Sequence, residues 1–232
     1  LDSSLEIMTA MANGGSDLIE IGIPFSDPIA EGPVIQEADL RSLAQGTTTD
    51  KVFELTKKLS GRVDTPLVYM TYLNVLFKYG YDKFLQNAKD AGISGVIVPD
   101  LPYEEKDELQ SVAEKYDIDV ISLIAPTSED RIKMIASDAK GFIYTVSSMG
   151  VTGMRNEIKT DLQSIVSHIK SVTDVPVAIG FGINKPQQAK EFSAYADGVI
   201  VGSAIVNIVA EHGKDAPEYV FDYVKSMKDA IR

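Results

Sequence analysis

Cysteine is absent from this 232-residue sequence, and histidine occurs only twice. A chain without cysteine can form no disulfide bond, no thiolate metal site and no cysteine nucleophile. His168 and His212 fall within a predicted surface helix and at a predicted helix end. We therefore expect no histidine-based catalytic triad and no bound metal. A sequence without disulfides is also typical of a cytoplasmic enzyme.

Long apolar runs and an excess of positive charge are missing as well. No stretch approaches the roughly 18 consecutive apolar residues of a membrane-spanning helix, so we expect no membrane association. The formal net charge is -12 and the sequence pI is about 4.6. Such a negative field repels nucleic acids and anionic membranes. An anionic ligand would have to be held by backbone amides or by a few local cations.

The composition fits one large α/β domain over residues 1–232, with 44% hydrophobic and 24% charged residues. Short apolar runs alternate with amphipathic, charged segments, which is the pattern of repeated βα units. The predicted strands cover residues 18–23, 66–72, 95–98, 119–123, 141–146, 175–180 and 198–201. The predicted helices between them cover residues 50–59, 81–91, 104–116, 128–137, 161–172 and 185–194.

A further amphipathic helix is predicted over residues 2–8, ahead of the first predicted strand. A βα repeat that begins with a helix implies a preceding strand that is missing from the chain. Seven strands and one missing strand make eight, the number in a (β/α)8 TIM barrel. We therefore predict an N-terminally incomplete barrel, and an open, doubly wound α/β sheet is the alternative.

The most informative feature of the sequence is a pair of glutamates. Glu20 interrupts the apolar run 18–23, and Glu31 follows across a loop punctuated by proline and glycine, 24–33. Such a strand is typically buried on both faces, where an ionised carboxylate is costly unless it is paired or used in chemistry. Desolvation raises the pKa of a buried glutamate toward neutrality, the range that suits a general acid and base. The alternative is a structural ion pair at the strand end.

Other polar residues fall near strand ends, where barrel enzymes assemble their active sites. Asp27 is either a catalytic residue or a turn former, and Asp100 is placed for helix entry or a subunit contact. Tyr72 and Asn74 end the second predicted strand and Tyr144 lies near the end of the fifth. For these side chains, packing is the alternative to a role in the site.

Two glycine clusters follow the last two predicted strands, at residues 180–182 and 202–204. Glycine lets a ligand approach the backbone closely, and the amides at a helix start can bind an anion without net positive charge. The clusters therefore predict a phosphate site in the usual position of a barrel. The stretch 147–160 has no apolar periodicity and is either a lid or an ordinary surface loop.

Four segments together closely resemble the tryptophan synthase alpha subunit family, and the match runs in order along the whole chain. They are LIEIGIPFSDPIAEGPVIQ at 18–36, SSMGVTG at 147–153, GFGI at 180–183 and GSAIV at 202–206. The resemblance implies a (β/α)8 barrel that cleaves indole-3-glycerol phosphate to indole and glyceraldehyde 3-phosphate. It also implies an alpha2-beta2 heterotetramer with a beta subunit that carries PLP, and no cofactor in this chain.

The resemblance also implies a role for each matched residue. Glu20 is the general acid and base that protonates C3 of the indole and takes the hydroxyl proton. Glu31 matches the carboxylate that stabilises the cationic indole ring, although that position usually carries aspartate. The other matched residues are Tyr144 and Thr152 at the catalytic centre, Tyr72 in the indole pocket, Gly153, Gly180, Gly182, Gly202 and Ser203 at the phosphate, and Asp27 and Asn74 at the beta-subunit surface.

Three other functions stay open at this point. A stand-alone indole-forming lyase would work at full rate without a partner. An activating subunit with weakened catalysis is suggested by glutamate in place of aspartate at residue 31. Without the resemblance, another phosphate-binding barrel lyase or isomerase would have the same glycine clusters.

Overall fold

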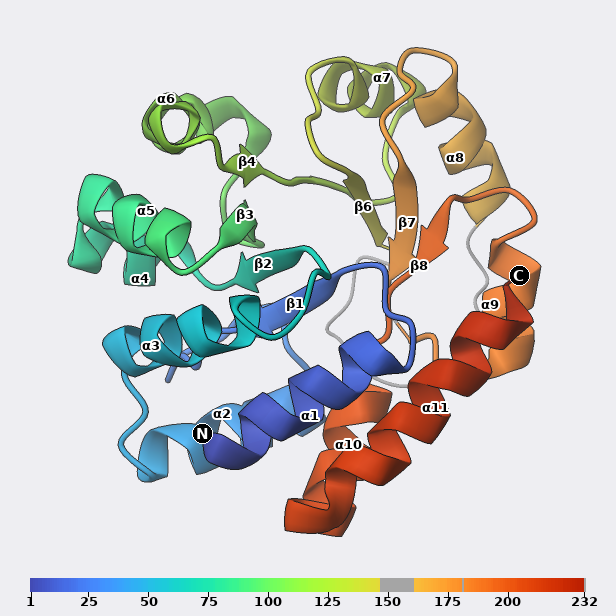
Figure 1. The fold of residues 1–232 in the computed structure, drawn as a ribbon. Helices are drawn as coiled ribbons and strands as arrows, with labels where there is room; N and C mark the ends of the chain where they lie inside the picture. Colours follow the sequence, from blue (N-terminus) through green and yellow to red (C-terminus); the bar gives the residue numbers. More distant parts are fainter. Residues whose placement is uncertain (147–160, 181, 232) are drawn as a thin grey trace.

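The computed structural model describes residues 1–146, 161–180 and 182–231. Within these residues the strands form two four-stranded parallel sheets, ordered β1-β2-β3-β4 and β5-β6-β7-β8. Helices surround the strands on the outside (Figure 1), which is the barrel architecture predicted from the sequence. The strands are β1 (Ile19–Gly22), β2 (Leu67–Met70), β3 (Ile93–Ile97), β4 (Asp119–Val120), β5 (Ser122–Ile124), β6 (Ile143–Val146), β7 (Val177–Gly180) and β8 (Gly198–Val199).

All seven predicted strands are present, and the fourth is divided in two. β4 pairs with β3, and β5 pairs with β6. Ile121 lies between them, and its N–H still donates to Val96 O at 2.9 Å. The eight labelled strands thus occupy seven barrel positions. Among the described residues β1 is paired with β2 alone and β8 with β7 alone, and the strand expected to precede residue 1 stays a prediction.

The helices include the predicted ones and several that the apolar pattern did not indicate. The predicted segment 104–116 is divided by short 3-10 turns. The α-helices are α1 (Asp2–Asn13), α2 (Pro33–Ala44), α3 (Thr49–Ser60), α4 (Leu73–Tyr79), α5 (Tyr81–Asp90), α6 (Asp107–Ala113), α7 (Glu129–Ser137), α8 (Leu162–Lys170), α9 (Pro186–Phe192), α10 (Ser203–His212) and α11 (Ala216–Ala230). In the described part of the chain, no helix is long and apolar enough to cross a membrane.

Local sequence signals explain where several helices begin. Thr48 accepts a hydrogen bond from Lys51 N at 3.3 Å, and α3 then buries one apolar face. The Asp161 carboxylate accepts a hydrogen bond from Ser164 N at 3.0 Å at the start of α8. Such side-chain caps satisfy N–H groups that have no partner within the helix. The caps fix the helix starts, and the buried apolar faces hold the helices against the strands.

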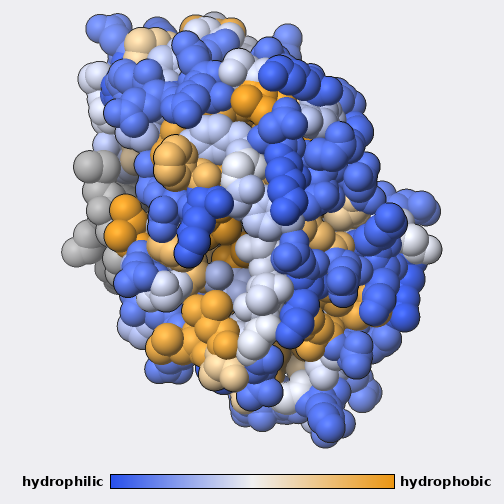
Figure 2. All heavy atoms as spheres, turned by 90° about the vertical axis from the view of Figure 1, so that its left-hand side faces the viewer, coloured by the Kyte–Doolittle hydropathy of each residue, from blue (hydrophilic) through white to orange (hydrophobic). Residues whose placement is uncertain are grey.

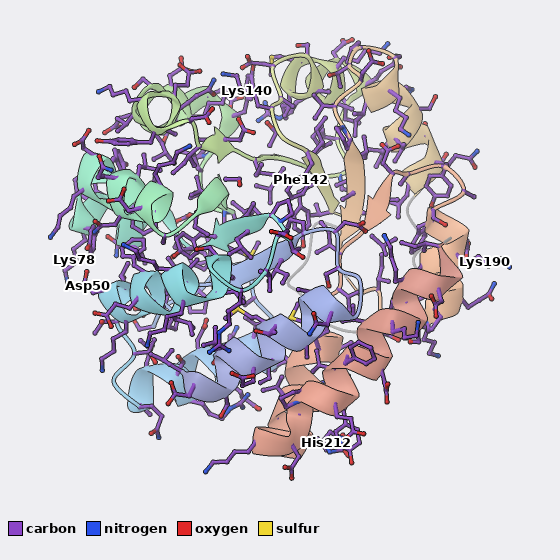
Figure 3. The ribbon with its side chains drawn as sticks, in the orientation of Figure 1. Asp50, Lys78, Lys140, Phe142, Lys190 and His212 are labelled. Atoms are coloured by element: carbon purple, nitrogen blue, oxygen red, sulfur yellow. The ribbon has the colours of Figure 1, made fainter. Side chains whose placement is uncertain are left out.

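Side-chain alternation along the strands separates two apolar layers. Ile19 and Ile21 of β1 belong to a core between the strands and the outer helices. A second cluster fills the barrel interior, where Phe142 points between the two sheets (Figure 3). The interior cluster includes Val68, Ile97, Ile121 and Tyr144, with Leu18, Met70, Leu123, Phe142, Val146 and Ile200 packed against it. Because side chains alternate, Leu18, Glu20 and Gly22 face this interior.

Candidate functional site

Glu20 projects from β1 into a cavity with a volume of about 1530 Å³. A Cβ atom added to Gly22, two residues further on, would meet no atom within 4 Å, so the space beside the carboxylate is open. Burial, followed by the negative charge of Glu31, raises the pKa of Glu20 from 4.5 to about 7. Within the described residues no cation counters this shift. The raised pKa expected from the apolar strand is confirmed, and it disfavours the ion-pair alternative.

Glu31 lies in the loop after β1, lines the same cavity and is 6% exposed. The Tyr72 hydroxyl donates a hydrogen bond to its carboxylate and accepts two from the loop, from Ile29 N at 3.1 Å and Ala30 N at 2.8 Å. Burial is the largest cause that raises the pKa of Glu31 to about 7, and the charge of Asp39 is the next. Tyr72, which lies between β2 and α4, therefore orients the second carboxylate.

Tyr144 is buried on β6, where the negative charges of both glutamates act on its hydroxyl group. Burial, then the charges of Glu20 and Glu31, raises its pKa well above its ordinary value, which keeps the hydroxyl protonated. Its ring lies against Gly180: a Cβ atom there would be 2.5 Å from Tyr144 Cε1 and 2.7 Å from its hydroxyl oxygen. The sequence pattern predicts Gly180 at the phosphate. The structure adds a second reason for glycine at this position, because any side chain would displace the Tyr144 ring.

The other described glycines of the predicted phosphate site line the same cavity as the glutamates. Gly182 follows β7 with a φ of +94°, where a side chain would be strained. Gly202 precedes α10 and Ser203 is its first residue, so both stand at a helix N-terminus that faces the cavity. Free N–H groups at such a terminus favour an anion. Thr152, Gly153 and the lid candidate at 147–160 lie outside the described residues.

The two residues predicted at a partner surface are both exposed. Asp27 lies in the loop after β1, where its carboxylate accepts a hydrogen bond from the Ser26 hydroxyl, and Asn74 lies in the first turn of α4. Asp100 caps α4 as well, because its carboxylate accepts a hydrogen bond from Leu73 N at 2.8 Å. Asp100 therefore caps a helix, as the sequence suggested. That helix, α4, precedes Asp100 in the chain, and Asp100 reaches it from the loop after the neighbouring strand β3.

Asp39 is a site residue that the sequence pattern did not indicate. It lies on α2, is partly buried and lines the cavity. Burial raises its pKa to about 6. Its spacing of three residues from Gln36, whose amide donates to Glu31 O at 2.7 Å, places both on one side of α2. In the part of the chain that is described, no three His, Asp or Glu side chains are grouped to hold a metal ion.

Comparisons with known proteins identify the family. The family model described as "Tryptophan synthase alpha chain" matches residues 1–232. The chain belongs to the tryptophan synthase alpha chain family. The alpha chain of Lacticaseibacillus casei is 49% identical over 230 residues, which are 99% of this chain and 86% of that protein. The alpha chain of Lactiplantibacillus plantarum is 47% identical over 231 residues, 99% of this chain and 87% of that one.

Solved structures of alpha subunits have the same fold. The tryptophan synthase subunit alpha of Legionella pneumophila superposes with a TM-score of 0.89 at 36% identity, covering 99% of this chain and 87% of that one. The structure titled as the tryptophan synthase a2b2 complex of Pyrococcus furiosus has a TM-score of 0.90 at 35% identity, covering 98% and 92%. Membership of the alpha chain family and the barrel fold expected from the sequence are thereby confirmed.

Proposed function

We propose that this chain cleaves indole-3-glycerol phosphate to indole and glyceraldehyde 3-phosphate by a retro-aldol reaction. The observation that carries the proposal is the placement of Glu20 and Glu31 on one cavity, each with a pKa raised to about 7. A carboxyl group of that pKa can donate a proton and accept one at neutral pH. The start of α10 and Gly182 lie on the same cavity and provide backbone amides for the phosphate.

The proposed steps use side chains alone. The protonated Glu20 gives its proton to C3 of the indole ring, which places positive charge on the ring. Glu31 accepts a hydrogen bond from the ring N–H and stabilises that charge in the transition state. The Glu20 carboxylate then takes the proton of the glycerol hydroxyl, the carbon–carbon bond breaks, and its electrons return to the ring. Aldehyde and indole are released, and Glu20 is protonated again.

A beta subunit completes tryptophan synthesis in this proposal, as part of an alpha2-beta2 heterotetramer in the cytoplasm. The PLP chemistry belongs to that partner, and this chain needs no cofactor of its own. Support for the assembly comes from the Pyrococcus furiosus relative, which is described as part of a tryptophan synthase a2b2 complex. We propose that Asp27 and Asn74 contact the partner.

Exposed apolar side chains lie near both contact residues. Ile29, in the loop with Asp27, is 71% exposed, and Phe77, on α4 with Asn74, is 68% exposed. The face that carries α3, α4 and α5 has apolar patches among hydrophilic side chains (Figure 2). Tyr72 connects this surface to the proposed catalytic carboxylate. Its hydroxyl accepts hydrogen bonds from the Ile29 and Ala30 N–H groups and donates one to Glu31. A partner that presses on the loop would thus act on the second carboxylate.

The reaction is tested by incubating the chain with indole-3-glycerol phosphate, alone and with a beta subunit. We expect equal amounts of indole and glyceraldehyde 3-phosphate, released faster when the beta subunit is present. Full activity without the partner would favour the stand-alone lyase. If no indole forms in either mixture, the proposed reaction is wrong and the weakened activating subunit is favoured.

A further inference from the structure

The loop between β7 and α9 brings the backbone of Gly182 and Ile183 to the cavity. Gly182 has a φ of +94°, a conformation that glycine adopts without strain. Asn184 donates a hydrogen bond from its side-chain amide to Gly182 O at 2.9 Å. The C=O and N–H of a trans peptide group point in opposite directions. By holding Gly182 O, the Asn184 side chain therefore also fixes the direction of the Ile183 N–H.

The other end of this loop is fixed to α9. Gln188, in the first turn of α9, accepts two hydrogen bonds through its side-chain oxygen, from Asn184 N at 2.9 Å and from Lys185 N at 3.1 Å. These two amides are therefore turned toward the start of the helix. An anion in the cavity would meet the backbone of Gly182 and Ile183 instead.

Tyr223 adds a contact from α11. This helix packs against α9 (Figure 1), and the Tyr223 hydroxyl donates a hydrogen bond to Asn184 O at 2.9 Å. The C=O of that peptide group is thus held by Tyr223, while its N–H, which belongs to Lys185, is held by Gln188. Burial raises the pKa of Tyr223 to about 12, so the hydroxyl keeps its proton at neutral pH and remains a donor.

We propose that Tyr223 is a positioning residue for the phosphate group of the substrate: its hydroxyl holds Asn184, and Asn184 holds the Gly182 peptide group at the cavity. This inference rests on the proposed function, in which phosphate is the anion that the loop binds. The Tyr223 ring has a separate role, because it packs against the apolar clusters beneath α9 and α11. A variant that loses only the hydroxyl separates the two roles.

Three variants test the proposal. Tyr223→Phe removes the hydroxyl and keeps the ring, whereas Asn184→Ala removes the side-chain contact with Gly182 O and keeps the backbone. Tyr219→Phe is the matched control, because it removes a hydroxyl from an exposed tyrosine on the same helix. The first readout is the Kd for inorganic phosphate and, separately, for indole, each from an NMR titration of the backbone amides. The second is KM and kcat for indole release with the beta subunit present.

In Tyr223→Phe we expect inorganic phosphate to bind about three- to tenfold more weakly, the range of one neutral hydrogen bond, and indole to bind as in wild type. KM for indole-3-glycerol phosphate should rise by a similar factor while kcat stays within about twofold, because the loop holds a part of the substrate that does not react. Asn184→Ala should weaken phosphate binding similarly. Adding Tyr223→Phe to it should weaken binding little further, since the two contacts act in series.

The proposal is overturned if Tyr223→Phe binds phosphate as tightly as Tyr219→Phe does. Equal losses of phosphate and indole affinity would also overturn it, because the hydroxyl would then support the whole barrel rather than this loop. Additive losses in the double variant would rule out the route through Asn184. If the wild type releases no indole, the proposed reaction fails, but the phosphate titration still tests the role of Tyr223.

Discussion

Replacing Glu20 by glutamine should stabilise the folded protein at alkaline pH while it removes the proposed acid and base. Glu20 has a pKa raised from 4.5 to about 7 in the folded protein. The folded state therefore holds the proton more tightly than the unfolded state does. This contribution to stability is fully present below about pH 4.5 and is lost as the pH rises through about 7. Glutamine is neutral throughout and avoids that loss.

The size of the effect follows from the difference between the two pKa values. About 2.5 pH units at about 1.4 kcal/mol each give an upper limit of about 3.5 kcal/mol. This cost is screened in part by solvent, since Glu20 is partly exposed and lines the cavity. We expect Glu20→Gln to raise the free energy of unfolding by ~1–3 kcal/mol at pH 8 and to change it little at pH 4.5, where both side chains are neutral.

Urea unfolding followed by circular dichroism at several pH values between 4.5 and 8 measures this difference. Glu37→Gln on the exposed side of α2 is the control, and we expect it to change the free energy of unfolding by less than ~0.5 kcal/mol at each pH. If the stability difference between Glu20→Gln and wild type is the same at pH 4.5 and pH 8, ionisation of Glu20 has no cost in the folded protein and the raised pKa is wrong.

Three further outcomes test the packing around the site and the core. Gly180→Ala should displace the Tyr144 ring and lower kcat, measured by indole release, because the new Cβ would lie 2.5 Å from Tyr144 Cε1; an unchanged kcat would argue against this contact. Tyr72→Phe should cost ~1–3 kcal/mol in urea unfolding and reduce kcat, since it removes the hydroxyl that orients Glu31; wild-type values for both would contradict that role. Phe84→Ala should cost ~3–5 kcal/mol, because Phe84 is fully buried, and a loss below ~1 kcal/mol would contradict its place in the core.

The strands and the two glutamates could be predicted from the sequence because their signals are local. An apolar run such as 18–23 marks a buried strand wherever it occurs. The division of the fourth strand could not be predicted, since it depends on which neighbour each half pairs with. Ile121 has the same apolar character as the residues beside it, so only the three-dimensional pairing marks the break.

α2 and Asp39 were missed for a different physical reason. α2 (Pro33–Ala44) has no fully buried residue, so its sequence lacks the apolar periodicity by which helices are recognised. Without that helix, nothing places Asp39 on the cavity that Glu20 and Glu31 line. The glycine pattern marks Gly180 in the sequence, but it does not show that Tyr144 needs the space beside it. That ring belongs to another strand, and only the fold brings the two residues together.

In the reaction that we propose, Glu20 transfers the proton during the cleavage of indole-3-glycerol phosphate. The most direct test compares the rate of indole release by wild type, Glu20→Gln and Glu37→Gln, each with the beta subunit and at saturating substrate. We expect a loss of at least about 100-fold in Glu20→Gln, the usual contribution of a general acid and base, and a wild-type rate in Glu37→Gln. Indole release by Glu20→Gln at the wild-type rate would contradict it.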